Sequence, residues 1–246
     1  MNKKEVLIRL ASLFTVSTLL VFTAVFALGA GTSRKDNSIL TDGGSSVKEK
    51  EEKFVLILDA GHGGEDGGAT GLSGALEKEL NLQVTLKTAE LLEAMGYEVL
   101  LTREDDRMLG EGEKGHKKLA DLKYRLEFAN SHENALLISI HMNKFPMEYC
   151  KGIQLYYAPA NTQSLPLAKI LHALVKDFQP ENQRELKEAG SAIYLLDRTT
   201  VPALLMECGF LSNAEEEALL KSEDYQKQLT CLIACTVCKY EEGLSA

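Results

Sequence analysis

Residues 54–64 of the 246-residue chain are FVLILDAGHGG, and residues 79–102 are ELNLQVTLKTAELLEAMGYEVLLT. The unbroken apolar run at 54–59 predicts a strand that is buried on both faces. Helical spacing over 79–95 predicts a helix that Gly96 ends, and the apolar run 97–102 predicts the next strand. A strand, a helix and a strand in this order form a βαβ unit, which is typical of an α/β domain.

The same alternation continues to the end of the chain. We predict further strands at 135–141, 152–157 and 202–207, and helices near 119–131, 164–178, 213–221 and 223–242. The pattern therefore predicts a single α/β domain over residues 54–242, in which a mostly parallel twisted sheet is flanked by helices. Ligand sites of such sheets gather at the carboxyl ends of the strands.

The segment before this domain has a different composition. Residues 10–30 carry no charge and follow Lys3, Lys4 and Arg9. As a helix they would span roughly 30 Å, the thickness of a bilayer core, so we predict an N-terminal membrane anchor over residues 1–30. The basic residues place the domain on the outer face of the cytoplasmic membrane. A cleavable signal peptide is the alternative, and it would release the domain as a secreted protein.

Residues 31–53 are rich in Gly, Ser and charge, which predicts a flexible linker. The net charge of −9 and the absence of a dense Lys and Arg run argue against nucleic acid as a partner. Cys231, Cys235 and Cys238 lie on the predicted C-terminal helix. Their spacing is a weak indication of a metal site, and we expect them to be buried as small apolar side chains.

Residue types that bind zinc occur where three of the predicted strands end. His62 follows the first strand, and His141 and Glu207 end two later ones. Catalytic zinc usually takes three ligands from His, Asp or Glu and a water, and a further carboxylate beside that water would be the general base. Spacing leaves the carboxylates open among Asp59, Glu65, Asp66, Glu77, Glu79 and Glu207. The glycines at 61, 63, 64, 67 and 68 indicate either a close approach of the backbone to a ligand or a flexible surface loop.

Four sequence blocks occur in a specific order. They are DAGHGGEDGGA at 59–69, EKELNL at 77–82, SIHMN at 139–143 and PALLMECGFLSN at 202–213. Together they resemble the zinc-dependent N-acetylmuramoyl-L-alanine amidases of the amidase 3 family, and they frame the whole of residues 54–242. The resemblance implies that His62, Glu77 and His141 bind Zn²⁺ and that Glu207 is the catalytic acid/base.

Within that family, the chain resembles the germination-specific amidases of the spore cortex. The likeness extends to the single N-terminal anchor, to Thr102-Arg103, to residues 111–115 and to Asp121-Leu122 followed by Arg125. It implies hydrolysis of the amide between N-acetylmuramic acid and L-alanine in peptidoglycan, as a step toward muramic-δ-lactam in the space around the forespore. Some relatives need a lipoprotein partner for zinc binding and activity, so such a partner is a further expectation.

Two polar residues are weaker candidates for substrate binding. Asn143 lies two positions after His141 and has either this role or a structural one. Arg125, like Arg103, would pair with a peptide carboxylate, or with nearby aspartates at the surface. Two other functions stay open: a noncatalytic peptidoglycan-binding module, and a zinc peptidase that cuts within the stem peptide.

Overall fold

The computed structural model describes residues 54–110 and 116–244. In chain order, the elements are β1 (Val55–Ala60), α2 (Glu77–Ala94), β2 (Val99–Leu101), α3 (Lys117–Asn130), β3 (Ala135–Asn143), β4 (Gln154–Tyr157), α4 (Ser164–Phe178), β5 (Lys187–Glu188), α5 (Tyr194–Arg198), β6 (Ala203–Phe210), α6 (Ala214–Leu220) and α7 (Glu223–Leu244). The predicted anchor at 1–30 and linker at 31–53 lie outside the described residues. Within the described ranges, no helix combines the length and apolar character needed to cross a membrane.

All of these strands belong to one sheet, in the order β2-β1-β3-β6-β4-β5. The strands β2, β1, β3 and β6 are parallel to one another, whereas β4 is antiparallel to β6 and parallel to β5. The prediction of a single α/β domain is confirmed. Its sheet is mixed, because one of its strand pairs, β4 with β6, is antiparallel. A parallel return requires a crossover of about a dozen or more residues, usually with a helix. Residues 144–153 between β3 and β4 contain no helix, so the chain turns back and runs the opposite way.

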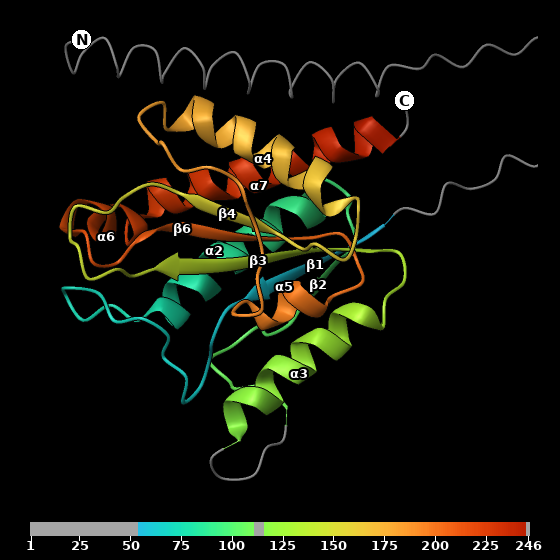
Figure 1. Cartoon of the computed structure of the whole chain (residues 1–246), viewed down its shortest axis with the longest axis horizontal. Coiled ribbons are helices and arrows are strands. Elements are labelled where there is room, and N and C mark those ends of the chain that lie inside the picture. The colour runs from blue at the N-terminus through green and yellow to red at the C-terminus, as the bar shows by residue number, and fades with distance from the viewer. Residues whose placement is uncertain (1–53, 111–115, 245–246) are drawn as a thin grey trace, which may run out of the picture. The chain divides into compact units, whose positions relative to one another are not determined.

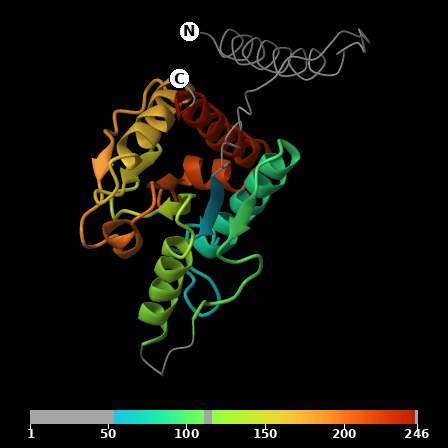
Figure 2. The ribbon, with the colours of Figure 1, turned by 90° about the vertical axis from the view of Figure 1, so that its right-hand side faces the viewer.

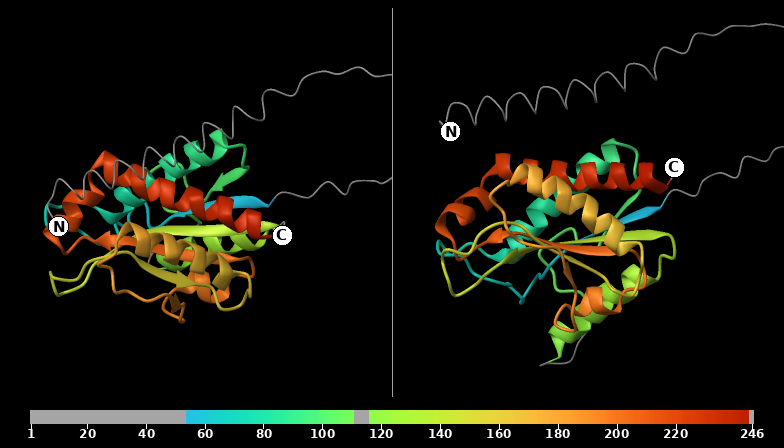
Figure 3. Two further views of the ribbon diagram at one scale, coloured as in Figure 1. Left: turned by 90° about the horizontal axis from the view of Figure 1, so that it is seen from above. Right: turned by 45° about the horizontal axis from the view of Figure 1, so that its top comes forward.

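Helices cover both faces of the sheet, as Figures 1 and 2 show. On one face lie α2, α4 and α7, and Figure 3 shows α4 and α7 packed along the same side of the domain. The opposite face carries α3 and α5, which pack against each other and over a smaller apolar cluster. The sheet is therefore the central layer of three, which explains why its strands are apolar on both sides.

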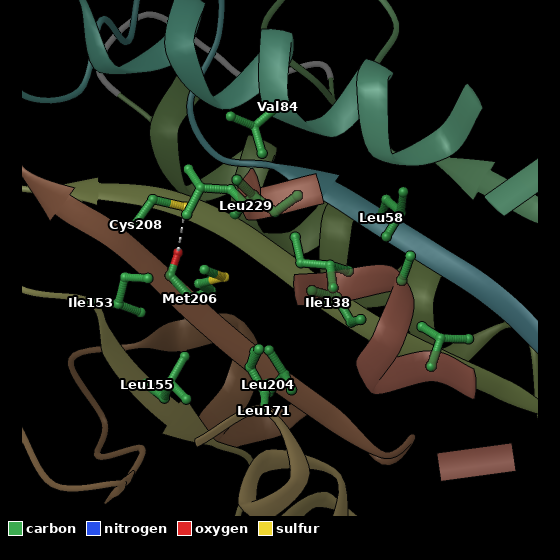
Figure 4. Close-up of a cluster of buried hydrophobic side chains, with 14 of the residues drawn as sticks. Leu58, Val84, Ile138, Ile153, Leu155, Leu171, Leu204, Met206, Cys208 and Leu229 are labelled. Carbon is green, nitrogen blue, oxygen red and sulfur yellow. Dashed lines mark hydrogen bonds between the residues drawn. The ribbon is translucent and has the colours of Figure 1, made fainter. Parts of the chain in front are cut away.

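The alternation of side chains along the strands divides the core into two clusters. Leu58, Ile138 and Leu204 lie on neighbouring strands and pack with Val84 of α2 and Leu229 of α7 in the larger cluster (Figure 4). The side chains adjacent to these in sequence point to the other face and join the smaller cluster: Ile57, Leu137 and Leu205. A polar residue in the first half of these strands would therefore face a buried layer, and their polar residues begin only at the middle of the strand or beyond it: Asp59, Ser139, His141, Asn143 and Glu207.

Several element bounds differ from the predicted ones. β3 continues two residues beyond His141, and β6 continues three residues beyond Glu207, so neither residue ends its strand. The register of β3 against β6 shifts between His141 and Asn143, which marks a bulge beside the polar residues. α2 begins at Glu77, two residues before the predicted start. The elements β5 and α5 were not predicted, because two residues and one helical turn are too short to produce a periodic pattern.

The prediction that the cysteines of the last helix are buried is wrong for two of the three. Cys231 and Cys235 are exposed, and Cys238 is half-buried. The buried stripe of α7 is formed instead by Leu229, Ile233, Val237 and Tyr240. Because this stripe occupies one side of the helix, the three cysteines fall on the side away from the core.

Candidate active site

Three side chains of the types that bind zinc converge from separate segments. His62 lies in the loop after β1, Glu77 is the first residue of α2, and His141 lies in β3. One donor atom from each lies within 4.8 Å of the other two. Glu77 Oε1 is 3.2 Å from His62 Nε2 and 2.9 Å from His141 Nδ1. Two imidazole nitrogens and one carboxylate oxygen form a donor set that suits catalytic zinc.

Backbone amides fix the carboxylate of Glu77. Its Oε2 accepts the amide of Ala69 at 2.7 Å, and its Oε1 accepts the amide of Met142 at 3.2 Å. Burial alone would raise the pKa of Glu77, but hydrogen bonds and charge from His141 and His62 outweigh it and hold this pKa well below its usual range. The group is therefore ionised at neutral pH, as a metal ligand must be.

The ring of His62 is oriented from the side opposite Glu77. Its Nδ1 lies 2.9 Å from Asp66 Oδ2, so the tautomer that donates its Nδ1 proton to this carboxylate would leave the lone pair of Nε2 for a metal on the side of Glu77. Burial lowers the pKa of His62, but its hydrogen bonds and charge interactions with Glu77 and Asp66 outweigh this and raise it. A carboxylate behind a metal-binding imidazole is the usual outer shell of a zinc site.

The glycines of the loop are needed for close approach of the backbone to the ligands. A Cβ on Gly61 would lie 2.2–2.6 Å from three atoms of the His141 ring. A Cβ on Gly68 would lie 2.6 Å from Glu77 Oε2, and the φ of 66° at Gly68 also favours glycine. Of the two interpretations open from the sequence, close approach is the one that these contacts support.

We expect Gly61→Ala to weaken zinc binding by about 10–100-fold, the loss typical of a displaced metal environment. The added methyl group must displace the His141 ring or the loop, because the ring atoms lie far inside van der Waals distance of it. The matched control is Gly190→Ala, since a Cβ there meets nothing within 4 Å. Zinc affinity measured by chelator competition should separate the two variants, and equal affinities would contradict the contact.

Glu207 lies beside this donor set. It is the register partner of His141 on the neighbouring strand, and both residues line a cavity of about 250 Å³ together with His62. Its buried Oε2 has no hydrogen-bond partner among the described residues. Burial and the charge of Glu77 raise the pKa of Glu207 to about 7, and the two histidines only partly offset this. An unpartnered carboxylate beside three ligand atoms fits a zinc ion with its water.

The other candidate carboxylates have different surroundings. Asp59 is fully buried and accepts hydrogen bonds from Ser139, Thr102 and Arg125. Glu65 and Glu79 are exposed, and Glu65 pairs with a lysine at the start of α3. Of the six candidates, Glu77 and Asp66 contact a histidine, and Glu207 lines the cavity beside them. Asp59 also lines the cavity, but its carboxylate already pairs with Arg125.

The two weaker candidates lie in contrasting positions. Asn143 is beyond the register shift of β3 and is absent from the described residues that line the cavity, so its substrate role stays a prediction. Arg125 lines this cavity, but it is only 2% exposed, and all three of its guanidinium nitrogens already donate to protein acceptors. Arg125 does pair with Asp121, one of the nearby aspartates, at 2.7 Å. The expected surface location is wrong, because Arg125 and Arg103 are both buried.

Sequence reasoning missed one polar residue that contributes to this site. Asn81 Nδ2 donates to the carbonyl of Gly61 at 3.0 Å and lies 3.4 Å from Glu77 Oε1. Its position four residues after Glu77, on the same face of α2, was the available signal. Asp66 was a candidate for the carboxylate set, but no spacing rule assigns it to the far side of the His62 ring.

Asp59 makes the domain sensitive to acid. Burial would raise the pKa of Asp59, but Arg125, Ser139 and Thr102 lower it to about 2. A depressed pKa contributes stability above the ordinary value near 3.9, and this stability is lost as the pH falls toward 2. We expect the free energy of unfolding of the zinc-free protein to lose roughly 2–3 kcal/mol from Asp59 between pH 5 and pH 2. When the free energy of unfolding from urea titrations is plotted against pH, it should change less steeply for Asp59→Asn than for the wild type. An identical pH dependence would contradict the assignment.

Comparisons with known proteins agree with this geometry. Residues 56–239 match the family Amidase 3, described as N-acetylmuramoyl-L-alanine amidase. The chain is 35% identical over 189 residues to the germination-specific N-acetylmuramoyl-L-alanine amidase of Bacillus subtilis (strain 168), an alignment that covers 76% of this chain and 79% of that protein.

Solved structures of amidases are also similar. The CwlD amidase from Clostridioides difficile, solved in complex with the GerS lipoprotein, is 37% identical with a TM-score of 0.73, over 77% of this chain and 99% of that one. The catalytic domain of CwlV from Bacillus (Paenibacillus) polymyxa var. colistinus is 34% identical with a TM-score of 0.66, over 77% of this chain and 98% of that one. The chain therefore belongs to the Amidase 3 family and is an N-acetylmuramoyl-L-alanine amidase.

Proposed function

We propose that this amidase is zinc-dependent, with His62, Glu77 and His141 as the metal ligands and Glu207 as the general acid/base. The observation that carries the proposal is the convergence of three ligand atoms within 4.8 Å, next to a buried carboxylate oxygen that lacks a partner among the described residues. The substrate bond is the amide between the lactyl group of N-acetylmuramic acid and L-alanine in peptidoglycan.

Zinc, when bound, would act as a Lewis acid toward the scissile carbonyl and would lower the pKa of a water molecule beside it. Glu207 would accept a proton from the attacking water, whose oxygen forms the new bond to the carbonyl carbon. Glu207 would then donate this proton to the nitrogen of L-alanine as the carbon–nitrogen bond breaks. The pKa of Glu207 is about 7 in the metal-free site, and the charge of a bound zinc ion would lower it, which favours the carboxylate form that accepts the proton.

The zinc requirement can be tested on the purified protein. Dialysis against a chelator should abolish hydrolysis of peptidoglycan, and stoichiometric zinc should restore it. Metal analysis should find about one zinc ion per chain, because the described residues contain one cluster of this donor type. Full activity after complete removal of metal would contradict the zinc proposal while leaving the family assignment intact.

The biological setting is the second part of the proposal. The relative from Bacillus subtilis is named germination-specific, which supports a role in spore cortex maturation and muramic-δ-lactam formation. We propose that residues 1–30 anchor the chain, that residues 31–53 link it, and that the catalytic domain of residues 54–242 acts outside the cytoplasmic membrane, around the forespore. Deletion of the gene in the source bacterium should remove muramic-δ-lactam from the cortex, and an unchanged cortex would contradict this setting.

A lipoprotein is the proposed partner. The support is that a structure 37% identical to this chain was solved as a complex of CwlD amidase with the GerS lipoprotein. Co-purification from sporulating cells, followed by mass spectrometry, should recover a lipoprotein with the full-length chain. Recovery of the amidase alone, with full zinc occupancy, would argue that this protein acts without such a partner.

A further inference from the structure

The backbone carbonyls of residues 60–64, here called the metal loop, all accept hydrogen bonds from inside the domain. Four of the five accept at least one bond from a cationic side chain. The bonds run to Ala60 from Arg103 Nε (2.9 Å) and Arg125 (2.8 Å), to Gly61 from Arg103 (3.1 Å), to His62 from Arg125 (2.7 Å) and to Gly64 from Lys78 Nζ (2.8 Å). The carbonyl of Gly63 accepts the amide of Asp66 instead. The metal loop therefore has its carbonyls turned inward and its His62 ring turned toward the cavity.

Both arginines are isolated from water, so these bonds are strong. Arg103 and Arg125 are each 2% exposed. Arginine stays charged when buried, and its planar fork can hold several acceptors in a fixed geometry. Asp59 and Asp121 compensate the charge of Arg125 through direct hydrogen bonds. The bonds to the metal loop are therefore made by desolvated charges, which are the more costly ones to lose.

This arrangement matters because His62 has a backbone conformation that side-chain-bearing residues rarely adopt. Its φ is 63°, and His62 is the only described residue other than glycine with a positive φ. Arg125 holds its carbonyl, and Asp66 holds its ring through Nδ1. With the backbone fixed at one end and the ring at the other, the direction of Nε2 toward Glu77 is determined.

Arg103 also connects two of the segments that carry ligands. Its NH2 group donates to the carbonyl of Lys78, at 2.7 Å, as well as to the carbonyl of Gly61. Lys78 is the residue after Glu77 in α2, so this one guanidinium joins the metal loop to the start of the helix that carries the carboxylate ligand. Arg103 therefore helps to set the separation of His62 and Glu77, together with the direct bonds from Lys78 and Asn81 to the metal loop.

We propose that Arg125 and Arg103 are positioning residues that hold the metal loop in its ligating conformation before zinc arrives, without touching the metal or the substrate. The proposal replaces the substrate-binding role that the sequence suggested for Arg125. It rests on the proposed zinc site, and it adds that the geometry of this site is built by buried cations bound to backbone carbonyls.

Arg125→Lys tests the proposal, because lysine keeps the charge and loses the fork. We expect zinc affinity to fall by about 10–100-fold, while the KM for peptidoglycan at saturating zinc stays near that of the wild type. A substrate-binding role predicts the reverse split, an unchanged zinc affinity with a raised KM, and that result would overturn the proposal. Failure of the wild type to bind zinc, both alone and together with the proposed lipoprotein partner, would instead count against the proposed metal site.

The matched control is Gln226→Met, which removes a buried polar group elsewhere. Gln226 is 2% exposed and donates to Gln83 and to the carbonyl of Leu220, with no bond to the metal loop. This variant should lose stability with no change in the zinc affinity of the folded protein. Equal losses of zinc affinity in Gln226→Met and Arg125→Lys would reduce the arginine effect to general destabilisation and would overturn the proposal.

Hydrogen exchange of the wild type gives a measurement that does not depend on a variant folding. The amide of Gly63 donates to the carbonyl of Asp66, and the amide of Gly64 donates to Asp106 Oδ1. If the arginines and Lys78 hold the loop, these amides should be protected in the zinc-free protein almost as well as in the zinc-bound one. Protection that appears only after zinc is added would mean that the metal organises the loop, which would contradict the proposal.

Discussion

Glu207→Gln should leave zinc binding intact and lower kcat by about 10²–10⁴-fold, the usual contribution of a general acid–base group. The amide is nearly isosteric with the carboxylate, so the strand β6 and the cavity should keep their shape. It cannot accept a proton from water near neutral pH, and it cannot return one to the departing amine. The measurement is the rate of stem-peptide release at saturating zinc, together with the zinc content of the variant.

A control with the same chemical change helps to interpret this result. Glu215 is exposed in the first turn of α6, so Glu215→Gln removes one surface charge without entering the cavity. We expect this variant to keep wild-type turnover and zinc content. A Glu207→Gln protein with full activity would remove Glu207 from the chemistry, and one that loses zinc would make it a ligand instead.

Glu77→Ala is expected to abolish zinc binding under conditions that saturate the wild type. Glu77 Oε1 is the atom shared by both histidines, and His62, Glu77 and His141 form the one cluster of metal-binding side chains among the described residues. The affinity loss should exceed the roughly 10–100-fold that removal of an outer-shell partner costs. His62→Ala should behave in the same way, because it removes the nitrogen on the other side of Oε1.

Glu79→Ala is the matched control for this change. Glu79 lies two residues further along α2, in the same first turn, and its side chain is exposed. Both substitutions remove one negative charge from the start of the helix, so their effects on the helix dipole are similar. Zinc affinity should fall in Glu77→Ala alone, as measured by competition with a chromogenic chelator, and a parallel fall in both variants would count against direct ligation.

The fold was predictable where apolar runs are long. The runs FVLILD and ALLISIH predicted β1 and β3 because both faces of a central layer must be apolar. The reversed direction of β4 was not predicted, since periodicity reports burial and carries no strand direction. The exposure of Cys231 and Cys235 could have been predicted, because Leu229, Ile233, Val237 and Tyr240 recur at helical spacing and place these two cysteines on the other side of α7.

The active site was predictable in part from the residues and in part from the family resemblance. The convergence of His62 and His141 followed from their positions near the carboxyl ends of neighbouring strands. The choice of Glu77 among six carboxylates came from the resemblance, because the predicted helix began after it and left Glu77 in a loop. The position of Arg125 beneath the metal loop depends on how α3 packs on the sheet, and tertiary contacts of this kind leave no local signal in the sequence.

The central claim is that this protein cuts the amide between N-acetylmuramic acid and L-alanine with the help of zinc. The most direct measurement is mass spectrometry of the products released from intact peptidoglycan by the purified protein, with zinc and with a chelator. We predict the release of free stem peptides that begin with L-alanine, in the presence of zinc only. Cleavage between two amino acids of the stem would contradict the claim and would instead identify a peptidase.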